Sequence, residues 1–403
     1  MQKSASTSLA AAVACVAGAA LAAVLLAYWR RRQESRFSKK SHPGEWAVWA
    51  RVDGARKGVV GRSAIRSLCY RFESDEHAEV LAKLLDPWSR DRITFHDFVN
   101  SFEAVQMMRT AARLKLWHRC CGIGVAGNVA GHMARAGEAD EHSVATAPAA
   151  IFTYYLPPHP FVVQDMLADK QRLEHFPVTY AVILLPKIPG ACKVQIEPEM
   201  GLYADIVYSV DRSRVERLVP RRVAAFNDCS IRSLEGASKL SQKKNWGFGS
   251  KGISLRSFPI DSFAPGSFVD NLALVAYFKR DMQVYQYTVN APVRNYLMFH
   301  EPLLEWIVEC INVQSSQTDT DKSEEVFTRL AESDYPTSTW IALGAGEYTQ
   351  WGQQNYLQPA DETVIMIYDE RIFPEGPSSE ELERQFNDLP APEGIVALHQ
   401  TFL

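Results

Sequence analysis

Cysteine is scarce and irregularly spaced in this sequence. Seven cysteines occur in 403 residues, Cys120 and Cys121 are adjacent, and no two cysteines have the C-x-x-C spacing. Structural zinc sites and disulfide frameworks both need cysteines at paired, regular spacings. The sequence therefore supports neither kind of site, and it favours a reducing compartment.

Excess positive charge is also absent. The formal net charge is −4, and no basic stripe interleaved with aromatic residues occurs outside one short run near the N-terminus. Proteins that bind nucleic acid normally carry such a stripe, so no nucleic-acid partner is expected. With 47% hydrophobic and 22% charged residues the chain is of an ordinary globular kind, and its length favours two folded units.

One stretch, residues 9–29, is uncharged over 21 positions and is followed at once by Arg30, Arg31 and Arg32. A bilayer core of about 30 Å needs about 20 helical residues, and a following basic cluster places that side in the cytoplasm. Residues 1–32 are therefore predicted to be a transmembrane anchor or targeting segment of a single-pass membrane protein whose bulk is cytoplasmic. The alternatives are a cleaved signal peptide or an organelle presequence, which would make the protein mitochondrial.

Residues 45–112 show two apolar-periodic helices around a short loop, repeated once. Counted as 12-residue loops, the first runs from Asp53 to Ala64 and the second from Asp86 to Asp97, with Val60 and Ile93 both at position 8. This arrangement resembles a pair of EF-hands. Position 5 of the loops is Lys57 or Arg90, whose positive charge would stand where Ca²⁺ binds. A degenerate EF-hand-like pair that packs or binds a partner without calcium is expected.

Three acidic residues further along the chain form a candidate cation site. Glu197 and Glu199 are two residues apart, so on a strand they face the same side. Asp228 adds a third carboxylate, and Lys251 follows on a glycine-bounded loop. Hard divalent cations prefer oxygen ligands, and a lysine can hold a bound carboxylate or enolate. Two solvated glutamates and a surface lysine are the alternative.

The order of these motifs resembles the fumarylacetoacetate hydrolase family. E-x-E, then N-D-x-S-x-R, then a G-x-K-G-x-S-like loop occur between residues 196 and 254. Upstream, CGIGVAGNVAGHMARAGEAD (121–140) is similar to the family's G-x-N-Y-x-x-H opening. Downstream, PTSTWIALGAGEYT (336–349) is similar to its T-G-T-P-A-G-V-G loop. The resemblance spans roughly Trp117 to Thr349.

The resemblance implies roles for particular residues. It makes the three carboxylates of Glu197, Glu199 and Asp228 ligands of Mg²⁺, Mn²⁺ or Ca²⁺, and it makes Lys251 the active-site lysine. It makes His132 a catalytic histidine preceded by Asn128, and it places Thr339 and Gly344 at the substrate. Arg232, four residues after the ligand aspartate, is interpreted as a structural partner.

The chain also departs from the family pattern. Many members carry a glutamate three residues after the histidine, where this sequence has Arg135. Val129 replaces the tyrosine after the asparagine, Leu255 stands four residues after the lysine, and the T-G-T-P loop has lost its proline. The chain is thus interpreted as a divergent member.

The expected architecture is α+β. Short apolar runs, TYAVILLP (179–186), LYADIVYSV (202–210), LALVAYFKR (272–280) and ETVIMIYDE (362–370), indicate strands. We expect a mixed, rolled β-sheet hydrolase-like domain over 117–403, preceded by the small all-α EF-hand-like domain and the N-terminal membrane helix.

The resemblance implies a divalent-metal-dependent hydrolase or lyase that acts on a C–C bond of a small 2-oxo or 1,3-diketo acid. The alternative is a catalytically silent, membrane-tethered scaffold that uses the EF-hand-like pair to bind a protein partner. The expected partners are a small carboxylic acid and the membrane, and a homodimer is left open.

Overall fold

The computed structural model describes residues 59–60, 93–94, 117, 119–129, 148–157, 177–179, 182–183, 185–186, 193–232, 234, 240–246, 250–313, 325–387 and 389–402. The chain divides into two compact units, one of residues 1–69 and 74–108 and one of residues 70–73 and 109–403. Among the residues described, no helix is long and apolar enough to cross a membrane. The predicted membrane helix at 9–29 and most of the EF-hand-like pair lie outside them.

In the first unit the structure describes a two-stranded antiparallel ribbon. Strand β1 (Val59–Val60) pairs with β2 (Ile93–Thr94), and Val60 lies opposite Ile93. These two residues hold the same position in the two predicted 12-residue loops. The EF-hand-like pair itself stays a prediction.

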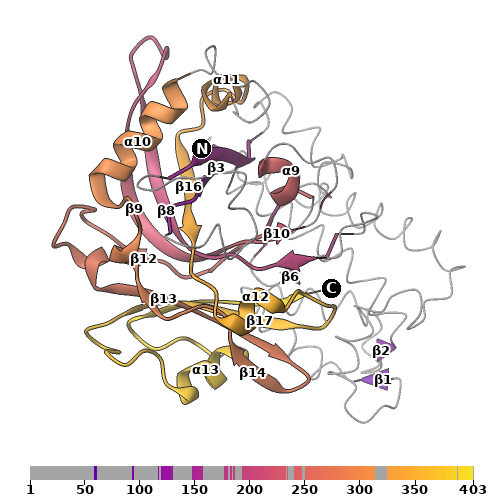
Figure 1. Ribbon diagram of the computed structural model, residues 1–403. Coiled ribbons are helices and arrows are strands. Elements are labelled where there is room, and N and C mark those ends of the chain that lie inside the picture. The colour runs from indigo at the N-terminus through magenta and orange to yellow at the C-terminus, as the bar shows by residue number, and fades with distance from the viewer. Residues whose placement is uncertain are drawn as a thin grey trace, which may run out of the picture. The chain divides into compact units, whose positions relative to one another are not determined.

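The larger sheet of the second unit has eight strands (Figure 1). Their order is β4-β3-β16-β8-β9-β11-β5, and β12 also pairs with β9. β16 runs parallel to β3 and β11 runs parallel to β5, while the other pairs are antiparallel, so the sheet is mixed. The strands are β3 (Cys120–Ala126), β4 (Ala150–Tyr155), β5 (Val178–Thr179), β8 (Pro198–Tyr208), β9 (Val215–Asp228), β11 (Lys251–Ile253), β12 (Phe258–Pro259) and β16 (Ser338–Ala345).

A second sheet has six strands in the order β14-β13-β17-β18-β6, with β15 paired to β13. These strands are β6 (Val182–Ile183), β13 (Leu272–Arg280), β14 (Gln283–Gln286), β15 (Ala291–Pro292), β17 (Glu362–Asp369) and β18 (Ile395–Phe402). A further short pair joins β7 (Val194–Gln195) to β10 (Ser230–Ile231). Strand alternation explains the layering, because Leu274 and Ala276 of β13 join the main core while Ala273 and Val275 face a smaller cluster on the other side.

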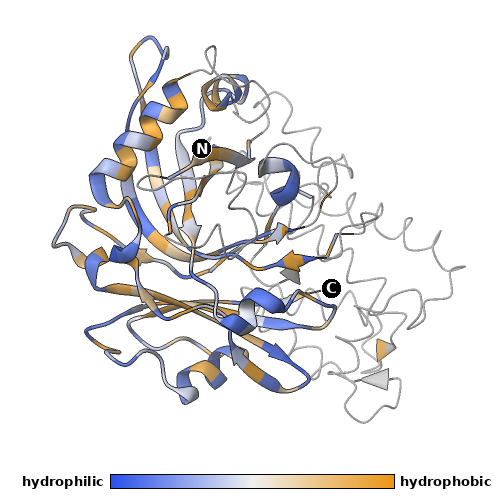
Figure 2. Ribbon diagram, in the orientation of Figure 1, coloured by the Kyte–Doolittle hydropathy of each residue, from blue (hydrophilic) through white to orange (hydrophobic). Residues whose placement is uncertain are grey.

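Few helices accompany the sheets. α10 (His300–Asn312) packs against β9 and β4 through Leu303, Leu304, Ile307 and Ile311, and its mixed bands of orange and blue in Figure 2 reflect this amphipathic pattern. The remaining helices are α9 (Leu240–Lys244), α11 (Val326–Glu332), α12 (Gln350–Gln354), α13 (Ser379–Phe386) and the 3₁₀ turns η2 (Phe268–Asn271) and η3 (Val293–Asn295). The expectation of a mixed, rolled β-sheet domain is confirmed in its coarser form, since the described part of the second unit is a mixed, curled β-sheet domain with few helices.

Candidate metal centre

The candidate site is positioned by three neighbouring strands, β8, β9 and β11. The backbone N–H of Asp228 donates to the carbonyl of Glu197 at 3.0 Å, and on the other side Lys251 is the register partner of Asp228. Glu197, Asp228 and Lys251 therefore form one row across the sheet. Asn227 reaches the other sheet by donating to Gln400 Oε1 at 2.8 Å, so alternation places Asp228 on the opposite face.

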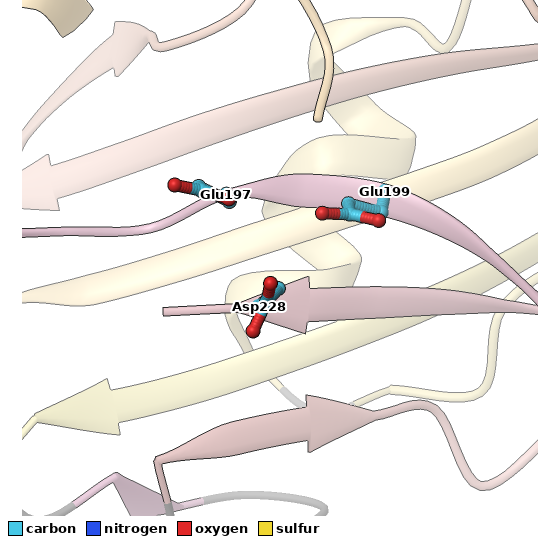
Figure 3. Close-up of side chains that lie close together, drawn as sticks. All are labelled: Glu197, Glu199 and Asp228. Carbon is cyan, nitrogen blue, oxygen red and sulfur yellow. The ribbon is translucent and has the colours of Figure 1, made fainter. Parts of the chain in front are cut away.

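Glu197 and Glu199 lie along one chain segment and Asp228 at the end of the next strand, as Figure 3 shows. One carboxylate oxygen from each lies within 4.8 Å of the others. All three side chains are buried, with 1–3% of each residue exposed. Three carboxylates that converge in a buried place repel one another unless cations neutralise them.

Three cationic side chains of this chain surround the carboxylates. Lys244 Nζ contacts Glu197 Oε2 and lies 2.5 Å from Asp228 Oδ2. Lys251 Nζ lies 2.8 Å from Asp228 Oδ1 in an ion pair. An Arg232 guanidinium nitrogen lies 2.7 Å from Glu197 Oε1. The predicted structural role of Arg232 thus takes the form of an ion pair with Glu197, and three positive charges face three negative ones.

Each of these cations also faces an aromatic ring. Lys244 Nζ lies 5.3 Å from the centre of the Phe152 ring, Lys251 Nζ lies 5.6 Å from that of Trp246, and the Arg232 guanidinium lies 5.8 Å from that of Tyr348. Ring faces attract cations at such distances. The rings therefore cover the cations while leaving their donors directed at the carboxylates.

The cluster shifts the acidity of its members. Burial, followed by the charge of Asp228, raises the pKa of Glu199 well above its usual range. Burial lowers the pKa of the Lys251 ammonium, against the opposing effect of Asp228. Burial alone would lower the pKa of Lys244, but the carboxylates of Asp228, Glu197 and Glu199 outweigh it and raise that pKa. Lys244 is consequently held as a positively charged ammonium.

Gly344, one of the two predicted substrate-binding residues, lies at the cluster. Its backbone N–H donates to Glu199 Oε2 at 2.7 Å. The φ of Gly344 is +121°, and a Cβ there would lie 2.9 Å from the Cβ of Asn128. Glycine is needed at this position because other residues rarely adopt such a φ.

Of the other residues to which the resemblance gives a role, Thr339 and Asn128 are described by the structure. Thr339 is buried on β16 opposite Ala204 of β8, and Ala204 is five positions beyond Glu199, or about 17 Å along a strand. The structure does not bring Thr339 to the carboxylates. Asn128 instead fastens loops, because its side chain donates to the carbonyl of Leu343 and accepts from the N–H of Met298. His132 and Arg135 lie outside the residues described.

Lys244 is the residue of this cluster to which the sequence did not point. It lies 16 positions after Asp228, in a stretch with several lysines and no periodic pattern. The sequence gives one indirect indication of this lysine, the G-x-G at Gly122 and Gly124. A Cβ on Gly124 would lie 2.2 Å from the Phe152 ring, and that ring faces Lys244. The G-x-G indicates close packing of an aromatic ring on the strand, and it does not identify Lys244.

The donor set suits a hard divalent cation. The Glu197, Glu199 and Asp228 group could hold one, since its ligand atoms are carboxylate oxygens that converge within reach of a single ion. The contacts of Lys244 with two of the three carboxylates add a condition to this fit, because an ion and an ammonium cannot use the same oxygens at once.

Three solved structures show what the fold is similar to. A 5-carboxymethyl-2-hydroxymuconate delta-isomerase from Mycobacterium smegmatis is 14% identical with a TM-score of 0.36, over 70% of this chain and 76% of that one. A 2-keto-3-deoxy-D-arabinonate dehydratase is 12% identical with a TM-score of 0.34, over 70% and 72%. A protein from Yersinia pestis CO92, described as of the fumarylacetoacetate hydrolase family, is 13% identical with a TM-score of 0.34, over 61% and 88%.

Comparison with curated proteins found no match. Among family models, the match is to DUF5718, described as a family of unknown function, over residues 138–402. This match covers the strands that build the carboxylate cluster and more than half of the chain. The protein therefore belongs to the DUF5718 family.

Proposed function

We propose that this protein is a divalent-metal-dependent hydrolase or lyase that acts on a C–C bond of a small 2-oxo or 1,3-diketo acid. The observation that carries the proposal is the convergence of the Glu197, Glu199 and Asp228 carboxylates within 4.8 Å of one another. Splayed carboxylates would favour the alternative, a catalytically silent scaffold. The resemblance of the site motifs to the fumarylacetoacetate hydrolase family supplies the substrate class.

In this proposal the three carboxylates hold Mg²⁺, Mn²⁺ or Ca²⁺. The bound ion supplies Lewis-acid polarisation of the substrate carbonyl oxygens. Lys251, whose ammonium already lies 2.8 Å from Asp228, neutralises the developing oxyanion or the substrate carboxylate. The N–H of Gly344 holds Glu199 in place.

His132 is proposed to move a proton or activate water, work that is typically worth about 10²–10⁴-fold in rate. Thr339 keeps its proposed substrate role only if the substrate extends along β16, because it lies well away from the carboxylates. The membrane anchor at residues 9–29 and a protein partner of the EF-hand-like pair also remain proposals.

The test is turnover of a panel of acylpyruvates and oxaloacetate by the full-length chain, with and without Mg²⁺, Mn²⁺ or Ca²⁺. Asp228→Asn should remove metal-dependent turnover. Asp205→Asn is the matched control, because Asp205 is a carboxylate of β8 that is only half-buried and is paired with Arg221 at 2.8 Å. The proposal fails if no member of the panel is turned over, or if turnover by Asp228→Asn equals that of the control.

A further inference from the structure

The Lys244 ammonium lies among the carboxylates, where it contacts oxygens that could otherwise coordinate a divalent cation. Its nitrogen contacts Glu197 Oε2 and lies 2.5 Å from Asp228 Oδ2. A divalent ion bound by these residues would need the same oxygens at about 2.0–2.6 Å. The ammonium and such an ion would compete for these two oxygens.

The charge balance leads to the same conclusion. The carboxylates of Glu197, Glu199 and Asp228 are faced by the cations Lys244, Lys251 and Arg232. With all six ionised the described cluster is neutral. Adding a divalent ion would leave two uncompensated positive charges in a buried place, which is costly. The departure of the Lys244 ammonium removes one positive charge and releases one oxygen each of Glu197 and Asp228, whose other oxygens keep their ion pairs with Arg232 and Lys251.

The backbone of Lys244 is held in place, and a long side chain carries its ammonium to the carboxylates. Lys244 is the last residue of α9, and its carbonyl accepts from Lys251 Nζ on β11. Its ammonium lies over the Phe152 ring. The lysine side chain is a flexible chain of four carbons. Rotation about its bonds can therefore move the ammonium away from the carboxylates without movement of the strands that carry them.

We propose that Lys244 is a built-in counter-cation that holds Glu197 and Asp228 in the metal-free protein and must leave them before a divalent cation binds. The inference rests on the proposed function, because both concern the same carboxylates. Metal binding is then an exchange of cations within the cluster. The apparent metal affinity of the wild-type protein is lowered by the fraction of molecules in which Lys244 is engaged.

Calorimetric titration of the full-length protein with Mn²⁺ and with Mg²⁺ tests this exchange. Lys244→Met keeps an unbranched side chain against Phe152 but removes the competing charge. If the engaged state outweighs the free one by about 10 to 1, the variant should bind metal about tenfold more tightly than wild type. Lys243→Met, which makes the same change at the neighbouring residue of α9, should leave the affinity within about twofold of wild type, far below that tenfold gain.

Thermal unfolding gives a second readout. Without metal, Lys244→Met should melt at a lower temperature than wild type, because three carboxylates then face two cations, and added Mn²⁺ should restore the melting temperature. If Lys244→Met does not fold without metal, Lys244→Gln, which retains hydrogen-bond donors toward the carboxylates, takes its place in both measurements.

The outcomes separate this inference from the proposed function. Equal affinities of wild type and both Lys244 variants overturn the inference and leave the proposed function standing. Binding by the Lys244 variants alone supports the inference and overturns metal dependence of the wild-type enzyme. Binding by no protein in the series overturns both.

Discussion

At the residue scale, Gly124 of β3 sets the position of the Phe152 ring. A Cβ on Gly124 would lie 2.2 Å from that ring, a separation that forces the ring or the strand to move. The ring faces the Lys244 ammonium. The lack of a side chain at Gly124 therefore affects the cation cluster indirectly, through the position of the Phe152 ring.

Gly124→Ala should lower the free energy of unfolding by about 1–3 kcal/mol, the usual cost of overpacking. Urea denaturation measures this change. Gly346→Ala serves as control, because a Cβ there would lie 3.4 Å from Leu274 Cδ2, near ordinary contact. Equal losses in the two variants would show that the Phe152 ring adapts freely.

The acidic half of the cluster could be predicted from sequence and the basic half only in part. Glu197 and Glu199 are set by strand alternation, and the motif order brought in Asp228 and Lys251. Lys244 could not be predicted, because α9 is a five-residue helix whose place over the sheet depends on tertiary packing. Its partners are 47 and 16 residues away in the chain, and no local period links them.

At the element scale, strands were predicted correctly where the apolar pattern of the sequence is uninterrupted. LALVAYFKR (272–280) coincides with β13, and ETVIMIYDE (362–370) contains β17. β9 was missed because Pro220 and several arginines interrupt its apolar pattern, and the structure has a register shift against β8 near Pro220, where a proline is tolerated. The run 179–186 was expected as one strand, but β5 and β6 belong to different sheets.

Asn227 links the two sheets of the second unit. It donates to Gln400 Oε1 of β18 at 2.8 Å and accepts from the N–H of Glu197 at 3.0 Å. Asn227→Ala would leave both buried partners unsatisfied, so the free energy of unfolding should fall by about 1–3 kcal/mol for each lost partner. Chemical denaturation measures the loss. An effect no larger than that of Gln283→Ala, at an exposed position on β14, would contradict it.

The helix α13 begins with a capping box. Ser378 accepts from the N–H of Glu381 at 3.3 Å, and Glu381 accepts from the N–H of Ser378 at 2.8 Å. Ser378→Ala should cost about 1 kcal/mol of stability. Ser378 also holds the pKa of Glu381 below its usual range, so that contribution is present above the unfolded pKa of about 4.3 and is lost as the pH falls through the folded value.

The measurement is the difference in melting temperature between wild type and Ser378→Ala across pH 3 to 7. The difference should be largest near neutral pH and should shrink in acid. A difference that stays constant over this range would contradict the part assigned to the Glu381 carboxylate.

At the scale of the whole molecule, the two units are proposed to differ in cation binding: the first unit binds no Ca²⁺, and the second binds a divalent metal. The unit predicted over 45–112 carries Lys57 and Arg90 in its loops, where calcium ligands would be needed. Calorimetry of this fragment with Ca²⁺ should show no micromolar binding. Micromolar affinity would overturn the ligand-free EF-hand-like reading.

The second unit should gain stability from metal through Asp228. A cation that binds only the folded state stabilises it by mass action, by about 2.7 kcal/mol at 100 times its dissociation constant. Asp228 lies in the middle of the row between Glu197 and Lys251, so Asp228→Asn removes one ligand and the charge that pairs with two lysines. Metal-dependent thermal stabilisation should therefore vanish in Asp228→Asn and persist in Asp205→Asn. Persistence in Asp228→Asn would show that the ion binds elsewhere in the molecule.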